Sequence, residues 1–170
     1  ALDENRLSEA WVDLGAQFGA SASSDRFTVQ LRTLTEPDLL QRAVALAAQQ
    51  LAAPAWPDAV WQRDRERLSA ALREAENRPA TLAGRTFGQS VYGPHPYGRS
   101  ATPTTLQAIG VQDMQTFYRR HVNACRAQVV MVGAIDRAGA DRITDTLTQA
   151  LASNGCEPLS EVAEVAPLVQ

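Results

Sequence analysis

The order of extended and helical segments constrains the fold of this chain more than any other feature. Two short extended runs, 17–22 and 26–34, are separated by a few polar, turn-like residues. In the second run Phe27, Val29 and Leu31 alternate with polar neighbours, which is typical of a strand with one covered face. Two such runs joined by a short turn predict an antiparallel pair.

Helical segments flank this pair, and one further apolar run lies near the end of the chain. The run 127–135, AQVVMVGAI, is apolar at nearly every position and predicts a buried strand that returns to the sheet. Together these segments predict an α+β fold, a mostly antiparallel sheet with helices packed on one face. Apolar spacing and start signals, including Thr35 and Asp136 as caps, predict helices at 2–14, 35–51, 57–77, 79–92, 105–109, 114–122 and 136–151.

Composition excludes several classes of function. The chain has 170 residues, 45% of them hydrophobic, which is enough for one ordinary core. Its net charge is −3 and all sixteen basic residues are scattered arginines, a pattern that disfavours nucleic acid and anionic membranes as partners. No apolar run approaches the roughly 18 residues of a membrane span. The first residues lack both methionine and signal-peptide character, so we interpret the chain as part of a longer protein.

The two cysteines, Cys125 and Cys156, have no CxxC spacing and are too few for a disulfide framework. We therefore expect buried free thiols, with a Cys125–Cys156 disulfide as the alternative. His121 stands four residues before Cys125, but two ligands do not make a structural zinc site, so we expect no metal there.

Several motifs occur in a specific order along almost the whole chain: LG-x(3)-GASAS-x-D-x-F-x-V from Leu14, NRPA at 77–80, YGPHPYGRS at 92–100, FYRRHV at 117–122 and VVMVGAID at 129–136. This order resembles the pitrilysin/insulinase family of zinc peptidases, the inverzincins, in a bacterial member. Members of this family form a chamber of two halves, like a clamshell, from homologous domains that we call half-units. The resemblance implies that this chain is one half-unit from the first half of such a protein. Its fold would be of the mitochondrial processing peptidase type. The resemblance places that half-unit at 1–155, lacking its first strands, and a linker to a second homologous half-unit at 156–170. We also expect a periplasmic location.

Active relatives bind zinc through HxxEH, which the resemblance places upstream of this chain, and through a glutamate on the long charged helix. Counting back from Pro79 puts Ala71 at that third-ligand position and Asp64 at a supporting acidic position. A methyl group cannot coordinate zinc, so we expect neither metal ligands nor catalytic residues in this chain. Glu74, three residues further along the helix than Ala71, remains an alternative ligand. Its helix face also fits a row of solvent-exposed ion pairs with arginine. Asp64 either remains from a zinc site that this chain has lost or forms an ion pair with an arginine.

Two other segments are candidates for function. The strand Gln17, Phe18, Gly19, Ala20, Ser21 matches the edge strand on which relatives hold peptides, although its small residues also suit an ordinary edge. In HPYG, His95 lies between two prolines that restrict the backbone, and the resemblance makes it a loop residue. We expect it to support the loop's structure.

The preferred hypothesis is a non-catalytic half-unit that helps an active partner form a peptide-binding chamber, with zinc in the parent or partner only. The first alternative is part of an active zinc metalloendopeptidase whose HxxEH lies upstream. The second is a structural assembly subunit that binds neither peptide nor zinc.

Overall fold

The computed structural model describes residues 3–153, 156, 158, 161–162 and 164–165. The chain divides into two units, each described here by itself. Unit 1 comprises Ala1–Ala55 and Thr116–Cys156, and unit 2 comprises Trp56–Gln115 and Glu157–Gln170.

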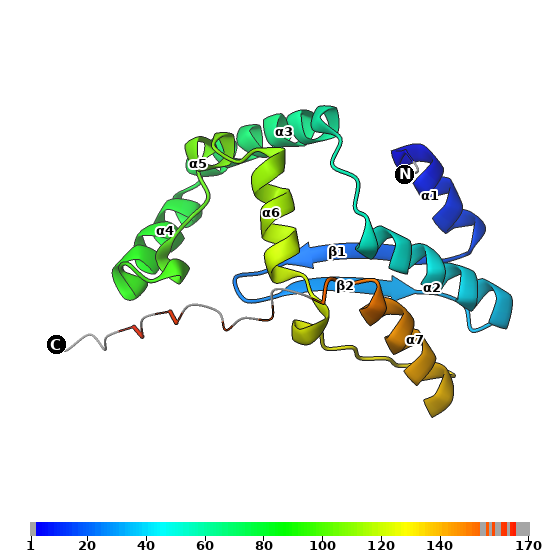
Figure 1. Ribbon diagram of the computed structural model, residues 1–170. Helices are drawn as coiled ribbons and strands as arrows, with labels where there is room; N and C mark the ends of the chain where they lie inside the picture. Colours follow the sequence, from blue (N-terminus) through cyan, green and yellow to red (C-terminus); the bar gives the residue numbers. More distant parts are fainter. Residues whose placement is uncertain (1–2, 154–155, 157, 159–160, 163, 166–170) are drawn as a thin grey trace. The chain divides into compact units, whose positions relative to one another are not determined.

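Unit 1 is built around a two-stranded antiparallel hairpin (Figure 1). Gln17 lies opposite Arg32 at one end of the hairpin, and Ala22 lies opposite Phe27 at the other. The elements of unit 1 are α1 (Glu4–Asp13), β1 (Gln17–Ala22), β2 (Phe27–Arg32), α2 (Pro37–Ala52), the second part of α6 (Val111–His121), η2 (Ala124–Arg126) and α7 (Arg137–Gln149).

Helices cover one face of the hairpin. Phe18 and Leu31 are directly opposite each other, so their side chains share a face. On that face the ring of Trp11 stacks on Phe18 with centroids 5.1 Å apart. The same hydrophobic core contains buried residues of α1 and α2, partly buried ones from both strands, and Leu147 of α7. The predicted α+β class, with helices on one face of an antiparallel sheet, is confirmed.

Local signals place some helix ends correctly and others not. The structure begins α5 (Pro103–Gln107) two residues before the predicted start at 105, and α6 at Val111, three residues before the predicted start at 114. The side chain of Asp136 accepts a hydrogen bond of 2.7 Å from the backbone N–H of Gly139, so its predicted role as the cap of α7 is confirmed. The prediction for Thr35 is wrong, because the cap of α2 is Glu36 and Pro37 begins the helix. A residue before proline is held in an extended conformation, and this property selects Glu36 as the last non-helical residue.

The predicted strand at 127–135 is also wrong. Residues 127–132 are neither strand nor helix, and from 128 onward their backbones make no hydrogen bond to the part of the chain that the structure describes. Val130 and Val132 are 77% and 98% exposed. A strand exists only through hydrogen bonds to a neighbour, and apolar character alone cannot supply one.

Unit 2 contains helices and no strand in its described part. It contains α3 (Asp58–Glu76), α4 (Pro79–Tyr92), η1 (Pro96–Gly98), α5 (Pro103–Gln107) and the first part of α6. The indole N–H of Trp61 donates to the carbonyl of Ile109 at 3.2 Å, which ties α3 to the end of the α5 segment. The bounds of α4 are those predicted from Pro79 and Tyr92.

The predicted linker, 156–170, lies largely outside the described residues. Its described positions, 156, 158, 161–162 and 164–165, are neither helix nor strand. The boundary between half-unit and linker stays a prediction.

Candidate functional site

The predicted peptide-binding segment, Gln17–Ser21, forms most of β1. β2 pairs with one edge of this strand, and among residues with a described structure no strand pairs with the other edge. Four of the five residues are exposed, and Phe18 is half-buried against the core. The small residues Gly19 and Ala20 let another backbone approach closely. An edge with these properties can accept an extended peptide through main-chain hydrogen bonds.

The predicted zinc positions lie on α3 and offer no metal site. Ala71 is exposed and has no ligand atom. The carboxylate of Asp64 lies 3.2 Å from the Nε of Arg63 and 3.8 Å from a guanidinium nitrogen of Arg67. Its side chain is one-third exposed, at 33%. Asp64 therefore acts as an arginine's partner, which was one of its two interpretations.

The carboxylates near the C-terminal end of α3 are paired in the same way. Glu74 forms an i,i+4 ion pair with Arg78, and Glu76 lies 3.4 Å from Arg85 of α4. Both pairs are at least partly exposed to solvent. This matches the interpretation of the helix face as a solvated row of acid–arginine pairs. A shifted ligand at Glu74 would have to give up its arginine.

The rest of the chain within the described ranges offers no metal-binding group either. No three His, Cys, Asp or Glu side chains lie close enough there to hold an ion. His121 packs its ring against Phe117, with centroids 4.5 Å apart, and Cys125 has no thiolate because it is disulfide-bonded. The described residues therefore do not fit a zinc ion.

His95 is part of the architecture of its loop. Its Nδ1 accepts a hydrogen bond of 3.1 Å from the backbone N–H of Tyr97, which caps η1. An accepting Nδ1 leaves the proton on Nε2 in the neutral ring. The edge of the Tyr97 ring packs against His95, with centroids 4.6 Å apart. The expectation that His95 serves the loop's own structure is supported by both contacts.

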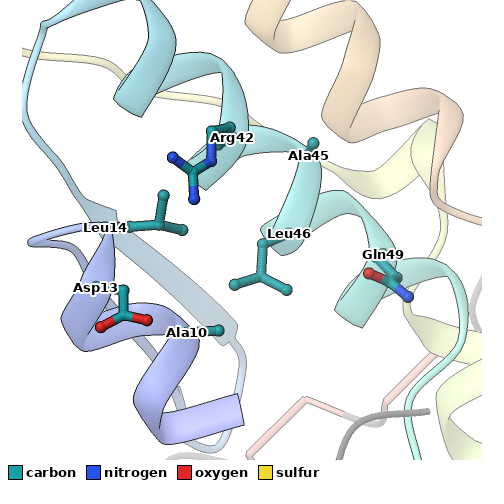
Figure 2. A pocket seen from close by; sticks show the side chains of 7 residues that line it. All are labelled: Ala10, Asp13, Leu14, Arg42, Ala45, Leu46 and Gln49. Atoms are coloured by element: carbon teal, nitrogen blue, oxygen red, sulfur yellow. The ribbon is translucent and has the colours of Figure 1, made fainter. Parts of the chain in front are cut away.

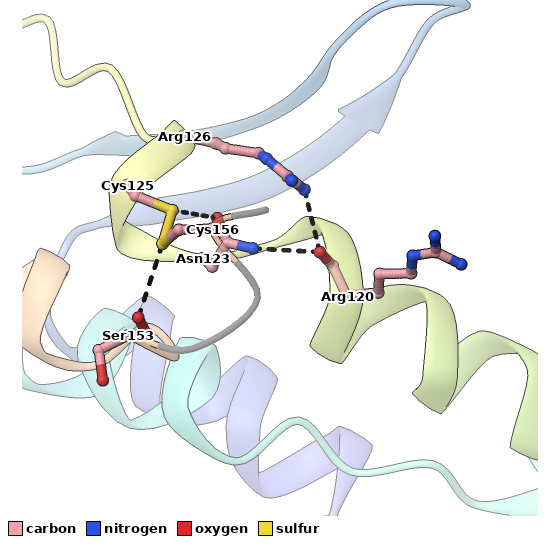
Figure 3. The surroundings of a disulfide bond; sticks show 6 residues. All are labelled: Arg120, Asn123, Cys125, Arg126, Ser153 and Cys156. Atoms are coloured by element: carbon pink, nitrogen blue, oxygen red, sulfur yellow. Dashed lines mark hydrogen bonds between the residues drawn. A yellow bond between two sulfur atoms is a disulfide. The ribbon is translucent and has the colours of Figure 1, made fainter. Parts of the chain in front are cut away.

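The two cysteines form a disulfide, so the expectation of buried free thiols is wrong (Figure 3). Their Cα atoms are 6.0 Å apart, within the range that a disulfide spans. Both residues are exposed. The reason for the error is tertiary: Cys125 lies in η2 and Cys156 follows α7, and a parallel bridge between Asn123 and Ala152 brings the two segments together.

A hollow of about 390 Å³ lies between α1 and α2 (Figure 2). Leu14 and Leu46 contribute apolar walls, and Asp13 and Arg42 contribute opposite charges. The hollow does not include any residue of the predicted peptide edge. The remaining lining residues are Ala10, Ala45 and Gln49.

The fold matches a solved structure closely. The crystal structure of a peptidase M16 inactive domain from Pseudomonas fluorescens superposes with a TM-score of 0.91 and is 23% identical in sequence. The match covers 98% of this chain and 40% of that chain, so this chain spans less than half of its structural relative. No protein-family profile and no curated protein matches the sequence. The similarity establishes a shared fold.

No helix in the described part of the chain is long and apolar enough to cross a bilayer.

Proposed function

We propose that this chain is a non-catalytic half-unit of a zinc-peptidase-like protein that contributes one wall of a peptide-binding chamber. Two facts support the absence of catalysis: Ala71 stands where the resemblance requires a zinc ligand, and the carboxylates nearby are occupied by arginines. The printed description of the structural relative as an inactive domain points the same way. A second homologous half-unit, and an active partner carrying the zinc site, would complete the chamber.

The observation that carries the proposal is the edge of β1 that no strand of the described chain covers. A strand edge with unpaired N–H and C=O groups is a template for another strand, and proteins usually block it with a charge, a proline or a bulge. The segment QFGAS contains neither a charge nor a proline. Its partner β2 pairs with it without interruption from Gln17 to Ala22, so no bulge twists the edge away. An extended peptide would add here as the next strand.

The proposal includes the domain boundary and the compartment. The half-unit spans 1–155, lacks its first strands, and is followed by a linker at 156–170. The Cys125–Cys156 disulfide supports a periplasmic location, because such bonds persist in oxidising compartments and are rare in the cytosol.

Proline substitutions in β1 test the edge. Successive residues of a strand point their N–H groups to opposite edges. Of the two variants Ala20→Pro and Ser21→Pro, one therefore removes an N–H from the outward edge, away from β2. The other removes an N–H that faces β2. The outward variant should fold and should lose about tenfold in peptide affinity, or ~1.4 kcal/mol, the scale of one or two backbone hydrogen bonds. Affinity is measured by fluorescence anisotropy with labelled unstructured peptides and the intact parent with its partner.

Ala20→Ser is the matched control, because it keeps both the N–H and a small side chain. It should bind peptides as the unaltered protein does. If the proline variant that folds keeps full affinity, peptides do not add to β1 and the assembly-subunit alternative becomes the better account.

A further inference from the structure

The run 127–135 is an apolar segment that has no paired neighbour in the described chain. Its backbone makes no hydrogen bond there from residue 128 to residue 132. Two of its side chains are largely open to solvent, Val130 at 77% and Val132 at 98% exposure. The run contains neither a charge nor a proline, the two kinds of residue that most often keep an exposed segment from pairing with another chain.

The order of residues in this run fits a strand that is covered on both faces. Side chains alternate between the two faces of a strand, so Val129 and Met131 would share one face and Val130 and Val132 the other. A strand with one solvated face has polar residues on that face, whereas a strand covered on both faces is apolar throughout. The composition is therefore that of an interior strand, and its neighbour is not among the described residues.

The hairpin of unit 1 has an open edge on its β2 side. β1 pairs with one edge of β2, and no strand with a described structure pairs with the other edge. Figure 1 shows residues 127–132 on the β2 side of the hairpin, where they run from η2 toward α7. A strand has two edges, so one further strand on this side can pair with β2 through one edge and with residues 128–132 through the other.

We propose that one of the first strands of the half-unit pairs with β2 on one side and with residues 128–132 on the other. The inference rests on the proposed function, which places those strands before residue 1 in the parent protein. The new strand uses the open edge of β2, whereas the proposed peptide uses the open edge of β1. The two additions therefore take place at opposite edges of the hairpin.

The exposure of the valines favours a permanent neighbour from the same polypeptide over a transient peptide. A peptide that dissociates would leave an uncharged, β-branched run open to solvent, and such a run promotes aggregation. A strand of the same polypeptide covers it at all times. The structural relative has this fold in 40% of its chain, so further residues are joined to the fold in that protein.

The first test is photo-crosslinking in the full parent protein, purified without added peptide. An aliphatic amino acid with a diazirine group is encoded at position 132, and the irradiated protein is digested with trypsin. The fragment Ala127–Arg137 should be joined to a fragment from upstream of residue 1 in the same chain, because side chains directly across paired strands are in contact. The same amino acid at Val12, an exposed valine of α1, is the control and should not react with that upstream fragment.

Other products of the crosslinking would overturn the proposal. A product that joins two copies would assign residues 128–132 to a homodimer. A product with residues 156–170 would assign them to the end of this chain, and one with a different protein would assign them to a separate partner. Because no peptide is added, a parent that binds no peptide at β1 can still give the expected product, and one that binds peptide can lack it.

The second test is hydrogen exchange of the same parent protein. Amides within 128–132 should exchange about a hundredfold more slowly than in a synthetic peptide of residues 127–137, because pairing protects them. Val132→Thr keeps a β-branched side chain and should keep this protection, whereas Val132→Asp should reduce it by about tenfold. Exchange throughout 128–132 at the rate of the synthetic peptide would show that the segment has no paired neighbour in the parent.

Discussion

The hydroxyl of Tyr118 donates a hydrogen bond of 2.8 Å to the backbone carbonyl of Leu51, 67 positions away in the sequence. Leu51 belongs to the last turn of α2, where carbonyl groups have no partner within the helix. Tyr118 of α6 therefore completes the end of α2 within unit 1. Burial raises the pKa of the Tyr118 hydroxyl above its ordinary value, because the charged phenolate would lose solvation.

This contact predicts a loss of stability at alkaline pH. With its pKa raised on folding, Tyr118 holds its proton more tightly in the folded state. Its contribution is complete below the unfolded pKa of about 10 and is lost as pH rises through the folded pKa. Tyr118→Phe should cost about 1 kcal/mol at pH 7, the usual net value of a hydrogen bond. It should also reduce the decline in stability as the pH rises above about 10.

Urea unfolding at a series of pH values measures both effects. Tyr97→Phe is the control, because Tyr97 is an exposed tyrosine of unit 2. If Tyr118→Phe and the unaltered protein lose stability equally at high pH, the alkaline loss has another source.

His95→Ala should lower the stability of the chain by about 1 kcal/mol, because it removes the acceptor for the Tyr97 N–H. Peptide binding by the intact parent should be unchanged. His95→Asn keeps a side-chain acceptor at the cap and should recover part of the loss. Thermal melts and peptide titrations test the two claims separately. Unchanged stability together with lost peptide binding would make His95 a binding residue.

Gly98→Ala should destabilise the HPYG loop. A Cβ at Gly98 would lie 2.8 Å from the carbonyl oxygen of Gly93, a backbone atom that cannot move aside on its own. Overpacking of this kind costs about 1–3 kcal/mol. Gly84→Ala in α4 is the matched control, because nothing lies within 4 Å of its Cβ. It should be neutral or stabilise the chain by up to ~1 kcal/mol through helix propensity. Chemical denaturation of both variants makes the comparison, and equal effects would contradict it.

The chain should bind zinc no more tightly than an ordinary surface histidine does, because Ala71 cannot act as a ligand. Purified protein is dialysed against zinc, and bound metal is counted by atomic emission. One zinc per chain, removable by a chelator, would refute the prediction. Loss of that zinc in Glu74→Ala, with retention in Glu66→Ala, would then identify a shifted carboxylate ligand.

The sequence alone determined the features whose causes lie within a few residues. Pro79 starts α4 where predicted because its fixed φ suits the first turn of a helix. Asp136 caps α7 because its carboxylate reaches an N–H three residues away. The β1–β2 hairpin follows from alternation and a short turn. Ala71 and the edge segment Gln17–Ser21 could be located by motif spacing, although their roles remain predictions.

Only the tertiary structure decided which distant groups meet. Cys125 and Cys156 form a bond because η2 and the end of α7 are neighbours in space, and no spacing rule contains that information. Residues 127–132 have the composition of a strand, yet a strand needs a hydrogen-bonded neighbour and they have none within the described chain. Short-range preferences act through a residue's own turn or strand, whereas these contacts depend on the packing of whole elements.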